Sequence, residues 1–174
     1  AVVVVTVRAL KMHGGGPRVV PGRALDEAYT TRNIELVEKG MGNLIAHIET
    51  VKKAGISPVV CINHFYTDHE DEINLIRSKM EEIGVRVAVS KHWLKGGEGA
   101  EELAKAVVEA CEEPTEFQYF YDEKDSIKEK IEILATQVYG ADGVDYSEEA
   151  SKKIAALQAN ESFKDMGICM VKAH

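Results

Sequence analysis

One apolar run of the chain stops abruptly at a polar and aromatic segment. Pro58–Ile62 contains no polar residue, and it is followed by Asn63, His64, Phe65, Tyr66, Thr67 and Asp68. A run of this kind is typical of a buried parallel strand, and ligands of parallel sheets bind beyond the carboxyl ends of the strands. Asn63 and Asp68 follow the layout of an Asn-x-x-x-Asp loop that reads a nucleotide base, with one extra residue. Alternatively, Asp68 or Thr67 caps the next helix, and we expect Asp68 or its neighbour to do so.

Two aromatic residues stand directly after successive predicted strands. Phe65 follows the first of them, and Trp93, the only tryptophan of the chain, follows the second. Two rings at neighbouring strand ends can stack on a flat heterocycle, and such stacking adds about 0.5 to 1.5 kcal/mol beyond the buried area. The alternative is that both rings pack under loops, and the spacing alone leaves both interpretations open.

A basic segment follows the first predicted strand. Arg8, Lys11, Arg18 and Arg23 occur before the first acidic residue, Asp26. In an acidic protein such a cluster suits a phosphate or carboxylate ligand, although a solvated basic loop explains it equally well.

A glycine-rich turn lies between a predicted strand and a predicted helix. Its residues Gly96, Gly97, Glu98 and Gly99 offer free N–H groups that can meet an anion. The turn lacks the Gly-Lys-Ser or Gly-Lys-Thr ending of a triphosphate loop, and a tight turn that caps the helix is the alternative. His64 and His69 match no zinc spacing, so no metal site is predicted.

The elements that position these residues alternate between strands and helices. The predicted strands are Val2–Val7, Pro58–Ile62 and Val85–Ser90, and the predicted helices are Asn33–Ala54, Glu70–Ile83 and about Ala100–Cys111. The long connection from Arg8 to Arg23 shows no helical pattern. The order predicts an α/β fold: a doubly wound, mostly parallel sheet with flanking helices.

The remainder of the chain differs in pattern. Residues 1–114 form the predicted sheet unit, and residues 115–174 are expected to add a helical cap and a return strand to the same domain. The cap contains predicted helices at Ser126–Tyr139 and Ser147–Gln158, and the return strand is expected at Ile168–Lys172.

Composition limits the class of protein. The chain has 174 residues and a formal net charge of -8, which disfavours nucleic-acid and anionic-membrane partners. It contains neither an apolar stretch of about 18 residues nor a signal peptide, so a cytoplasmic protein is expected. Cys61, Cys111 and Cys169 lie in apolar segments and are expected to be buried, reduced thiols. Because both ends fall within predicted strands, we expect a piece of a longer chain.

Six separated blocks of the sequence resemble formate-tetrahydrofolate ligases, in the same order. They are Thr6–Gly15, Ile62–Asp68, Lys95–Gly99, Ser126–Ile131, Tyr139–Val144 and Ile168–Met170. The resemblance covers nearly the whole chain but only a middle-to-late part of the family's longer one.

The resemblance implies an ATP-dependent ligase. Formate is phosphorylated to formyl phosphate, and tetrahydrofolate takes the formyl group to give 10-formyltetrahydrofolate. Phe65 and Trp93 fall where the family holds the pterin, and the basic segment from Arg8 then faces the cleft. The resemblance further implies Mg²⁺ with ATP, a monovalent cation in the full enzyme, a homotetramer, and a larger P-loop-type ligase fold whose triphosphate loop lies in an amino-terminal portion.

The chain departs from the family's usual Asn-Lys-Phe-Pro-Thr-Asp at two positions. His64 replaces the lysine and Tyr66 replaces the proline. The first change removes a permanent cation and the second frees the loop backbone. These changes motivate a second hypothesis, a catalytically inactive α/β module that serves subunit assembly.

Overall fold

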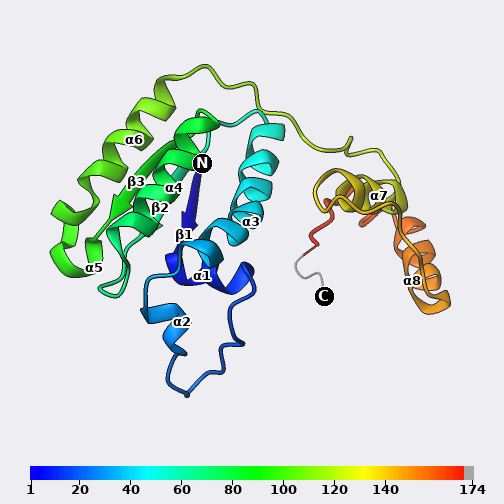
Figure 1. The fold of residues 1–174 in the computed structure, drawn as a ribbon. Helices are drawn as coiled ribbons and strands as arrows, with labels where there is room; N and C mark the ends of the chain where they lie inside the picture. Colours follow the sequence, from blue (N-terminus) through cyan, green and yellow to red (C-terminus); the bar gives the residue numbers. More distant parts are fainter. Residues whose placement is uncertain (171–174) are drawn as a thin grey trace. The chain divides into compact units, whose positions relative to one another are not determined.

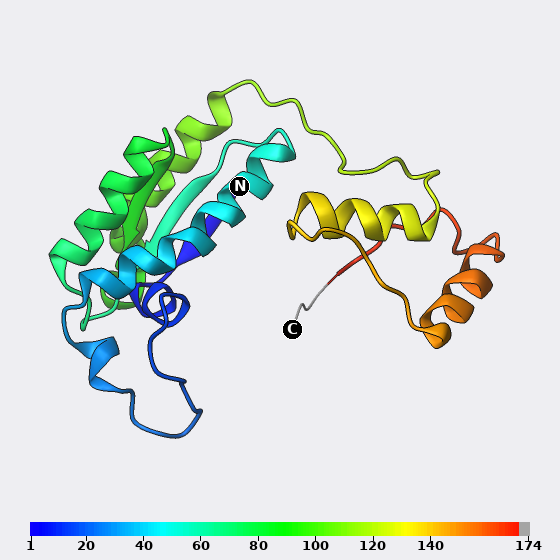
Figure 2. The ribbon, with the colours of Figure 1, turned by 45° about the vertical axis from the view of Figure 1, so that its right-hand side comes forward.

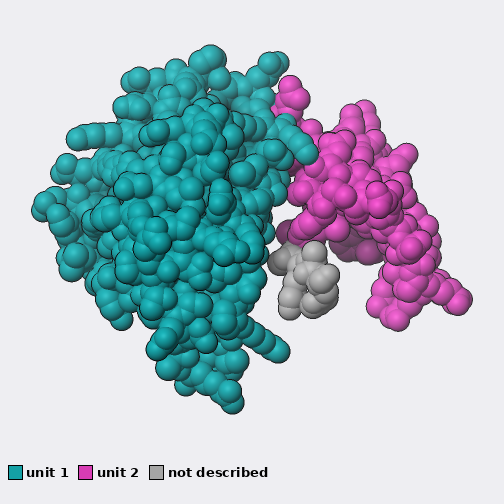
Figure 3. Space-filling model, viewed as in Figure 1, with its two compact units in different colours: residues 1–117 teal, residues 118–174 magenta. Residues whose placement is uncertain are grey.

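The computed structural model describes residues 1–170, and they fall into two compact units. The first unit is Ala1–Phe117, and the described part of the second unit runs from residue 118 to residue 170 (Figure 3). No helix in the described part of the chain is long and apolar enough to cross a membrane.

A three-stranded parallel sheet forms the centre of the first unit (Figure 1). The strands are β1 (Val2–Val5), β2 (Val59–Asn63) and β3 (Arg86–Ser90), in the order β1-β2-β3. β2 lies between the other two, and Val59, Val60, Cys61 and Ile62 are buried, as expected of a strand covered on both faces. The predicted α/β fold with a parallel sheet and flanking helices is therefore confirmed.

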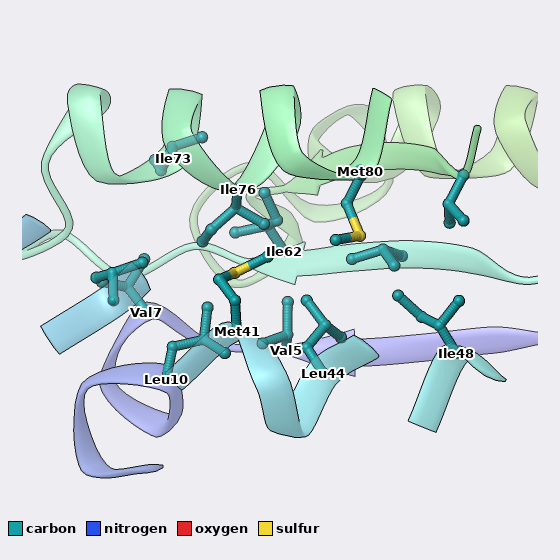
Figure 4. Close-up of a cluster of buried hydrophobic side chains, with 13 residues drawn as sticks. Val5, Val7, Leu10, Met41, Leu44, Ile48, Ile62, Ile73, Ile76 and Met80 are labelled. Carbon is teal, nitrogen blue, oxygen red and sulfur yellow. The ribbon is translucent and has the colours of Figure 1, made fainter. Parts of the chain in front are cut away.

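Two long helices, α3 (Ile34–Lys53) and α4 (Glu70–Glu82), cover one face of the sheet. Their apolar residues recur at helical spacing and meet the inward side chains of the strands (Figure 4). The buried cluster comprises Val5, Val7, Leu10, Val37, Met41, Leu44, Ile48, Val60, Ile62, Ile73, Ile76, Met80 and Val85. Asn33 is the N-cap of α3, as predicted, and its Oδ1 accepts the N–H of Leu36 at 3.1 Å.

The opposite face of the sheet carries α6 (Glu101–Glu112), which contacts β3 and β2. Val59 of β2 and Ala110 of α6 line one cavity of about 270 Å³ together with Val2. Val2 and Val4 of β1 are nevertheless 44% and 63% exposed, so α6 leaves part of this apolar face uncovered.

The connection after β1 differs from the prediction. β1 ends at Val5, so the predicted strand Val2–Val7 was too long, and α1 (Val7–His13) begins at Val7 and occupies the start of the segment expected to be irregular. A second short helix, α2 (Glu27–Thr30), follows that segment. Thr6 is the N-cap of α1, and its Oγ1 accepts the N–H of Ala9 at 3.0 Å. The prediction missed α1 because seven residues are too few to show a helical period. α1 packs against α3 (Figure 2).

The second unit contains α7 (Ile127–Gln137) and α8 (Glu148–Gln158), close to their predicted bounds. Lys130 is fully buried, and its Nζ donates to the carbonyls of Glu123 at 2.6 Å and Met166 at 3.2 Å. This lysine therefore ties α7 to the segments before and after the helix pair.

Two smaller expectations are corrected. The predicted return strand is absent from its described part, since Ile168–Met170 belong to no strand; the rest of that range lies outside the described residues. Of the three cysteines only Cys61 is buried, where burial raises the pKa of its thiol, whereas Cys111 and Cys169 are exposed.

Candidate functional site

The carboxyl ends of β2 and β3 lie side by side. Asn63, the last residue of β2, is the register partner of Ser90, the last residue of β3, and the N–H of His64 donates to the carbonyl of Ser90 at 3.1 Å. The loop from His64 to His69 and the short helix α5 (His92–Lys95) therefore start from adjacent positions. This is the edge at which the sequence places its candidate ligand-binding residues.

A tight turn holds Phe65 in place. The Phe65 N–H donates to Asp68 Oδ2 at 2.8 Å, and the Asp68 N–H donates to the Phe65 carbonyl at 3.0 Å. The helix N-cap is the neighbouring His69, whose N–H donates to Glu72 Oε2 at 3.3 Å. The Asp68 carboxylate thus fixes the loop, while its neighbour begins α4.

Trp93 of α5 is joined to the same loop. Its indole Nε1 donates to the His64 carbonyl at 2.6 Å, one residue before Phe65, and 49% of Trp93 is exposed. The hydrogen bond fixes the polar end of the indole and leaves about half of the side chain accessible. The structure therefore brings the two predicted stacking residues to adjacent segments of one edge.

The two basic residues of α1 have different surroundings. The guanidinium of Arg8 lies over the Phe65 ring, 4.3 Å from its centroid, and its Nη2 donates to Thr67 Oγ1 at 3.1 Å. Lys11 is fully buried, with its Nζ 2.7 Å from Glu72 Oε1 and 2.7 Å from the Thr31 carbonyl. Arg8 reaches the candidate site, whereas the Lys11 ammonium is engaged by Glu72 inside the unit.

Three buried polar atoms around Phe65 have no hydrogen-bond partner among the described residues: Arg8 Nε, His64 Nδ1 and Asp68 Oδ1. Native proteins pair most of their buried polar atoms, so a group of three at one loop is unusual. Burial raises the pKa of the Asp68 carboxyl, and this effect is opposed by the Phe65 N–H and by the charges of His64 and Arg8.

A pH measurement tests the burial of Asp68. Because its pKa is raised on folding, its favourable contribution is present below the ordinary aspartate value of about 3.9 and is lost as the pH rises through the folded-state value. Asp68→Asn removes the titrating group and keeps an oxygen that can accept the Phe65 N–H. We expect the free energy of unfolding, measured by urea denaturation at stepped pH, to fall less steeply with rising pH in the variant.

Asp71 provides the control for that measurement. Its hydrogen bond with Arg32 lowers the pKa of the Asp71 carboxyl, so its contribution is present above the ordinary value and is lost as the pH falls. Asp71→Asn should shift the pH dependence in the opposite direction. Parallel curves for wild type and Asp68→Asn would contradict the assignment to Asp68.

The glycine-rich turn forms a short 3₁₀ segment, η1 (Gly96–Ala100), between α5 and α6. Gly96 has a φ of 60°, and a side chain at Gly99 would lie 2.5 Å from the Lys91 carbonyl, so both positions require glycine. A cavity of about 280 Å³ beside the turn is lined by Glu98 and Gly99 but also by residues of α4 and β3. Gly97 is exposed at the turn. The glycines thus shape a tight turn, and anion binding by their N–H groups stays a prediction.

Sequence reasoning missed two residues of the edge. Thr67 Oγ1 accepts the hydrogen bond of Arg8. The Glu72 carboxylate pairs with Lys11 and also accepts two backbone N–H groups, that of Asn33 at 2.6 Å and that of His69. Thr67 and Glu72 lie inside or next to the singled-out loop, but their partners lie far away in the chain. No cluster of three or more metal-ligating side chains occurs among the described residues.

The family model for formate-tetrahydrofolate ligase matches residues 1–174. The chain belongs to the formate-tetrahydrofolate ligase family. It is 58% identical over all its residues to a formate-tetrahydrofolate ligase of Dehalococcoides mccartyi strain 195, of which it covers 29%. The identity is 55% with the enzyme of Desulforapulum autotrophicum, with 29% covered, and 51% with that of Desulfotalea psychrophila, with 31% covered.

The chain therefore spans about three tenths of the length of these formate-tetrahydrofolate ligases. The resemblance inferred from six sequence blocks is confirmed at the level of the family. Within that family, the edge formed by Arg8, Phe65, Asp68 and Trp93 is the candidate binding site of the chain.

Proposed function

We propose that this chain supplies the pterin-binding side of an ATP-dependent formate-tetrahydrofolate ligase. Phe65 and Trp93 stack on the pterin ring of tetrahydrofolate. The observation that supports this role best is the 2.6 Å hydrogen bond from Trp93 Nε1 to the His64 carbonyl, which holds the indole beside the Phe65 loop while 49% of Trp93 stays exposed.

In this proposal the amine of bound tetrahydrofolate attacks the formyl carbon of formyl phosphate. The new carbon–nitrogen bond forms, the carbon–oxygen bond to the phosphate breaks, and the amine proton is released to solvent as the phosphate leaves. This chain's residues bind and orient the pterin for that step. Asn63, Asp68 and the turn Gly96–Gly99 frame the ligand, and Asp68 acts by fixing the backbone of Phe65. Formate and ATP are the other substrates, and no described residue of this chain is assigned to Mg²⁺ or a monovalent cation.

The proposal includes a larger fold. The chain lacks the Gly-Lys-Ser or Gly-Lys-Thr loop, which another part of a longer polypeptide would supply. In that polypeptide the sheet is a doubly wound part of a P-loop-type ligase fold, and further chain covers the exposed Val2 and Val4 of β1. The second unit then forms the helical cap of the same domain. The assembled protein is a cytoplasmic homo-oligomer, a tetramer by resemblance to the family.

The stacking role is tested on the full-length polypeptide that carries this chain. Trp93→Ala is expected to weaken tetrahydrofolate binding, measured by isothermal titration calorimetry, by about 2- to 10-fold, because one stacked ring is lost. Leu94→Ala is the matched control, since Leu94 is the neighbouring residue of α5 and is 62% exposed. Equal affinities of wild type and Trp93→Ala would refute the stacking role.

The same protein distinguishes the second hypothesis, a catalytically inactive module that serves subunit assembly. Tyr66 and His64 replace residues usual in the family, and Tyr66 is 79% exposed on the loop. Formate-dependent release of ADP by the full-length protein would exclude an inactive module. A protein that assembles normally but releases no ADP would favour it.

A further inference from the structure

Arg8 has an environment that its place in a basic segment does not predict. Its guanidinium carbon lies 4.3 Å from the centroid of the Phe65 ring, although the two residues are far apart in the sequence. No carboxylate of the described residues pairs with Arg8 within salt-bridge distance, while its Nη2 donates to Thr67 Oγ1 at 3.1 Å. The side chain is therefore held by the loop itself and lies against its aromatic ring.

The backbone that carries Arg8 is fixed on both sides. Thr6 caps the start of α1, with its Oγ1 accepting the Ala9 N–H at 3.0 Å. Lys11, one turn after Arg8, is buried in the ion pair with Glu72 of α4. Because α1 is anchored at both ends, Arg8 is held over the ring rather than free in solvent.

Phe65 is fixed from its own side. Its N–H donates to Asp68 Oδ2, and its carbonyl accepts the Asp68 N–H. One face of the ring lies against the guanidinium, so the flat ligand of the proposed function would have to stack on the other face. A guanidinium is planar and stacks on aromatic rings in a way that an ammonium cannot reproduce.

We propose that Arg8 is a positioning residue that backs the Phe65 ring and sets its orientation for stacking, rather than a ligand for an anionic group. This inference rests on the proposed function, since it takes Phe65 as a platform for the pterin. Thr67 supports Arg8 in this role, because its hydroxyl accepts the hydrogen bond of Arg8 Nη2 and so holds the guanidinium beside the ring.

The test compares ligands that share the ring and differ in charge. The full-length protein is titrated with tetrahydrofolate and with a tetrahydropterin that lacks the glutamate tail. Arg8→Lys keeps the charge and loses the planar stack. We expect both ligands to bind about 3- to 10-fold more weakly, with the same factor for each. Arg86→Lys is the matched control, since Arg86 lies at the start of β3, away from the edge that carries Phe65, and pairs with Glu113; it should bind both ligands as the wild type does.

Steady-state kinetics provides a second readout. A backing residue contributes to ground-state and transition-state binding alike, so Arg8→Lys should raise the KM for tetrahydrofolate by a similar factor and leave kcat unchanged. Thr67→Val should act in the same direction with a smaller effect, and Thr67→Ser, which keeps the hydroxyl, should restore wild-type binding. If Arg8→Lys fails to fold, the comparison of Thr67→Val with Thr67→Ser still tests whether Arg8 backs the Phe65 ring.

If Arg8→Lys binds tetrahydrofolate more weakly but binds the tetrahydropterin as the wild type does, Arg8 is a ligand for the anionic tail and the proposal is overturned. Unchanged binding of both ligands in Arg8→Lys and Thr67→Val would overturn it as well. Trp93→Ala separates this outcome from a failure of the proposed function. If Trp93→Ala weakens tetrahydropterin binding and the Arg8 and Thr67 variants do not, only the backing role is wrong. If Trp93→Ala has no effect either, the stacking site itself is wrong.

Discussion

Replacing Lys11 with methionine is expected to lower the free energy of unfolding by about 3 to 5 kcal/mol. Lys11 and Glu72 are both fully buried, and their charged atoms lie 2.7 Å apart. The variant leaves the Glu72 carboxylate buried without its cation. Glu72 also accepts the N–H groups of Asn33 and His69 at the starts of α3 and α4, so the loss affects the anchoring of three helices. Urea denaturation followed by circular dichroism measures the change.

An exposed ion pair of the same residue types provides the control. Lys39 Nζ lies 2.6 Å from Glu35 Oε1, but the two side chains are 60% and 77% exposed. Lys39→Met should therefore change stability by less than about 1 kcal/mol. The double variant Lys11→Met with Glu72→Gln should be more stable than Lys11→Met alone, because no uncompensated charge stays buried. Equal effects of Lys11→Met and Lys39→Met would contradict the buried pair.

The sequence alone could not distinguish the environments of Arg8 and Lys11. Both belong to one basic segment, and the sequence predicts the same anion-facing role for both. The prediction missed α1, and this short helix directs Arg8 to the Phe65 loop and Lys11 toward Glu72. Positions three residues apart lie on the same face of a helix, so what distinguishes the two cations is the neighbour that each meets: Phe65 for Arg8 and the buried Glu72 for Lys11.

The elements that the sequence did predict are those with a long or distinctive pattern. The uninterrupted run of β2 indicated a strand covered on both faces, and the apolar spacing of α3 and α4 indicated two helices on the sheet. Parallel strands then place the residues after β2 and β3 at one edge, which is why Phe65 and Trp93 were predicted to be neighbours. The contacts of Thr67 and Glu72 depend on tertiary packing between distant segments, and no local pattern encodes them.

Gly40 lies inside α3, where a glycine ordinarily weakens a helix by up to about 1 kcal/mol, but its close approach to α1 gives it a packing role. A Cβ atom at Gly40 would lie 1.9 Å from the Leu10 carbonyl oxygen and 2.6 Å from its carbon, both backbone atoms of α1. Gly40→Ala is therefore expected to lower the free energy of unfolding by about 1 to 3 kcal/mol, because α1 must move away from α3. Thermal and urea denaturation of the purified variant measure the loss.

Gly42 provides a control two residues further along the same helix. A Cβ atom there would meet no atom within 4 Å, so Gly42→Ala should raise stability by up to about 1 kcal/mol through helix propensity alone. The two substitutions are chemically identical, so stability changes of opposite sign isolate the contact of Gly40 with α1.

Gly14→Ala probes that contact from the other helix, because its Cβ would lie 1.9 Å from the Leu36 carbonyl oxygen. One alanine already forces α1 and α3 apart, so the second alanine removes fewer contacts. The decrease in the free energy of unfolding of the Gly14→Ala, Gly40→Ala double variant should therefore be smaller than the sum of the two single decreases. Additive losses, or stabilisation by Gly40→Ala, would show that α1 and α3 do not pack this closely.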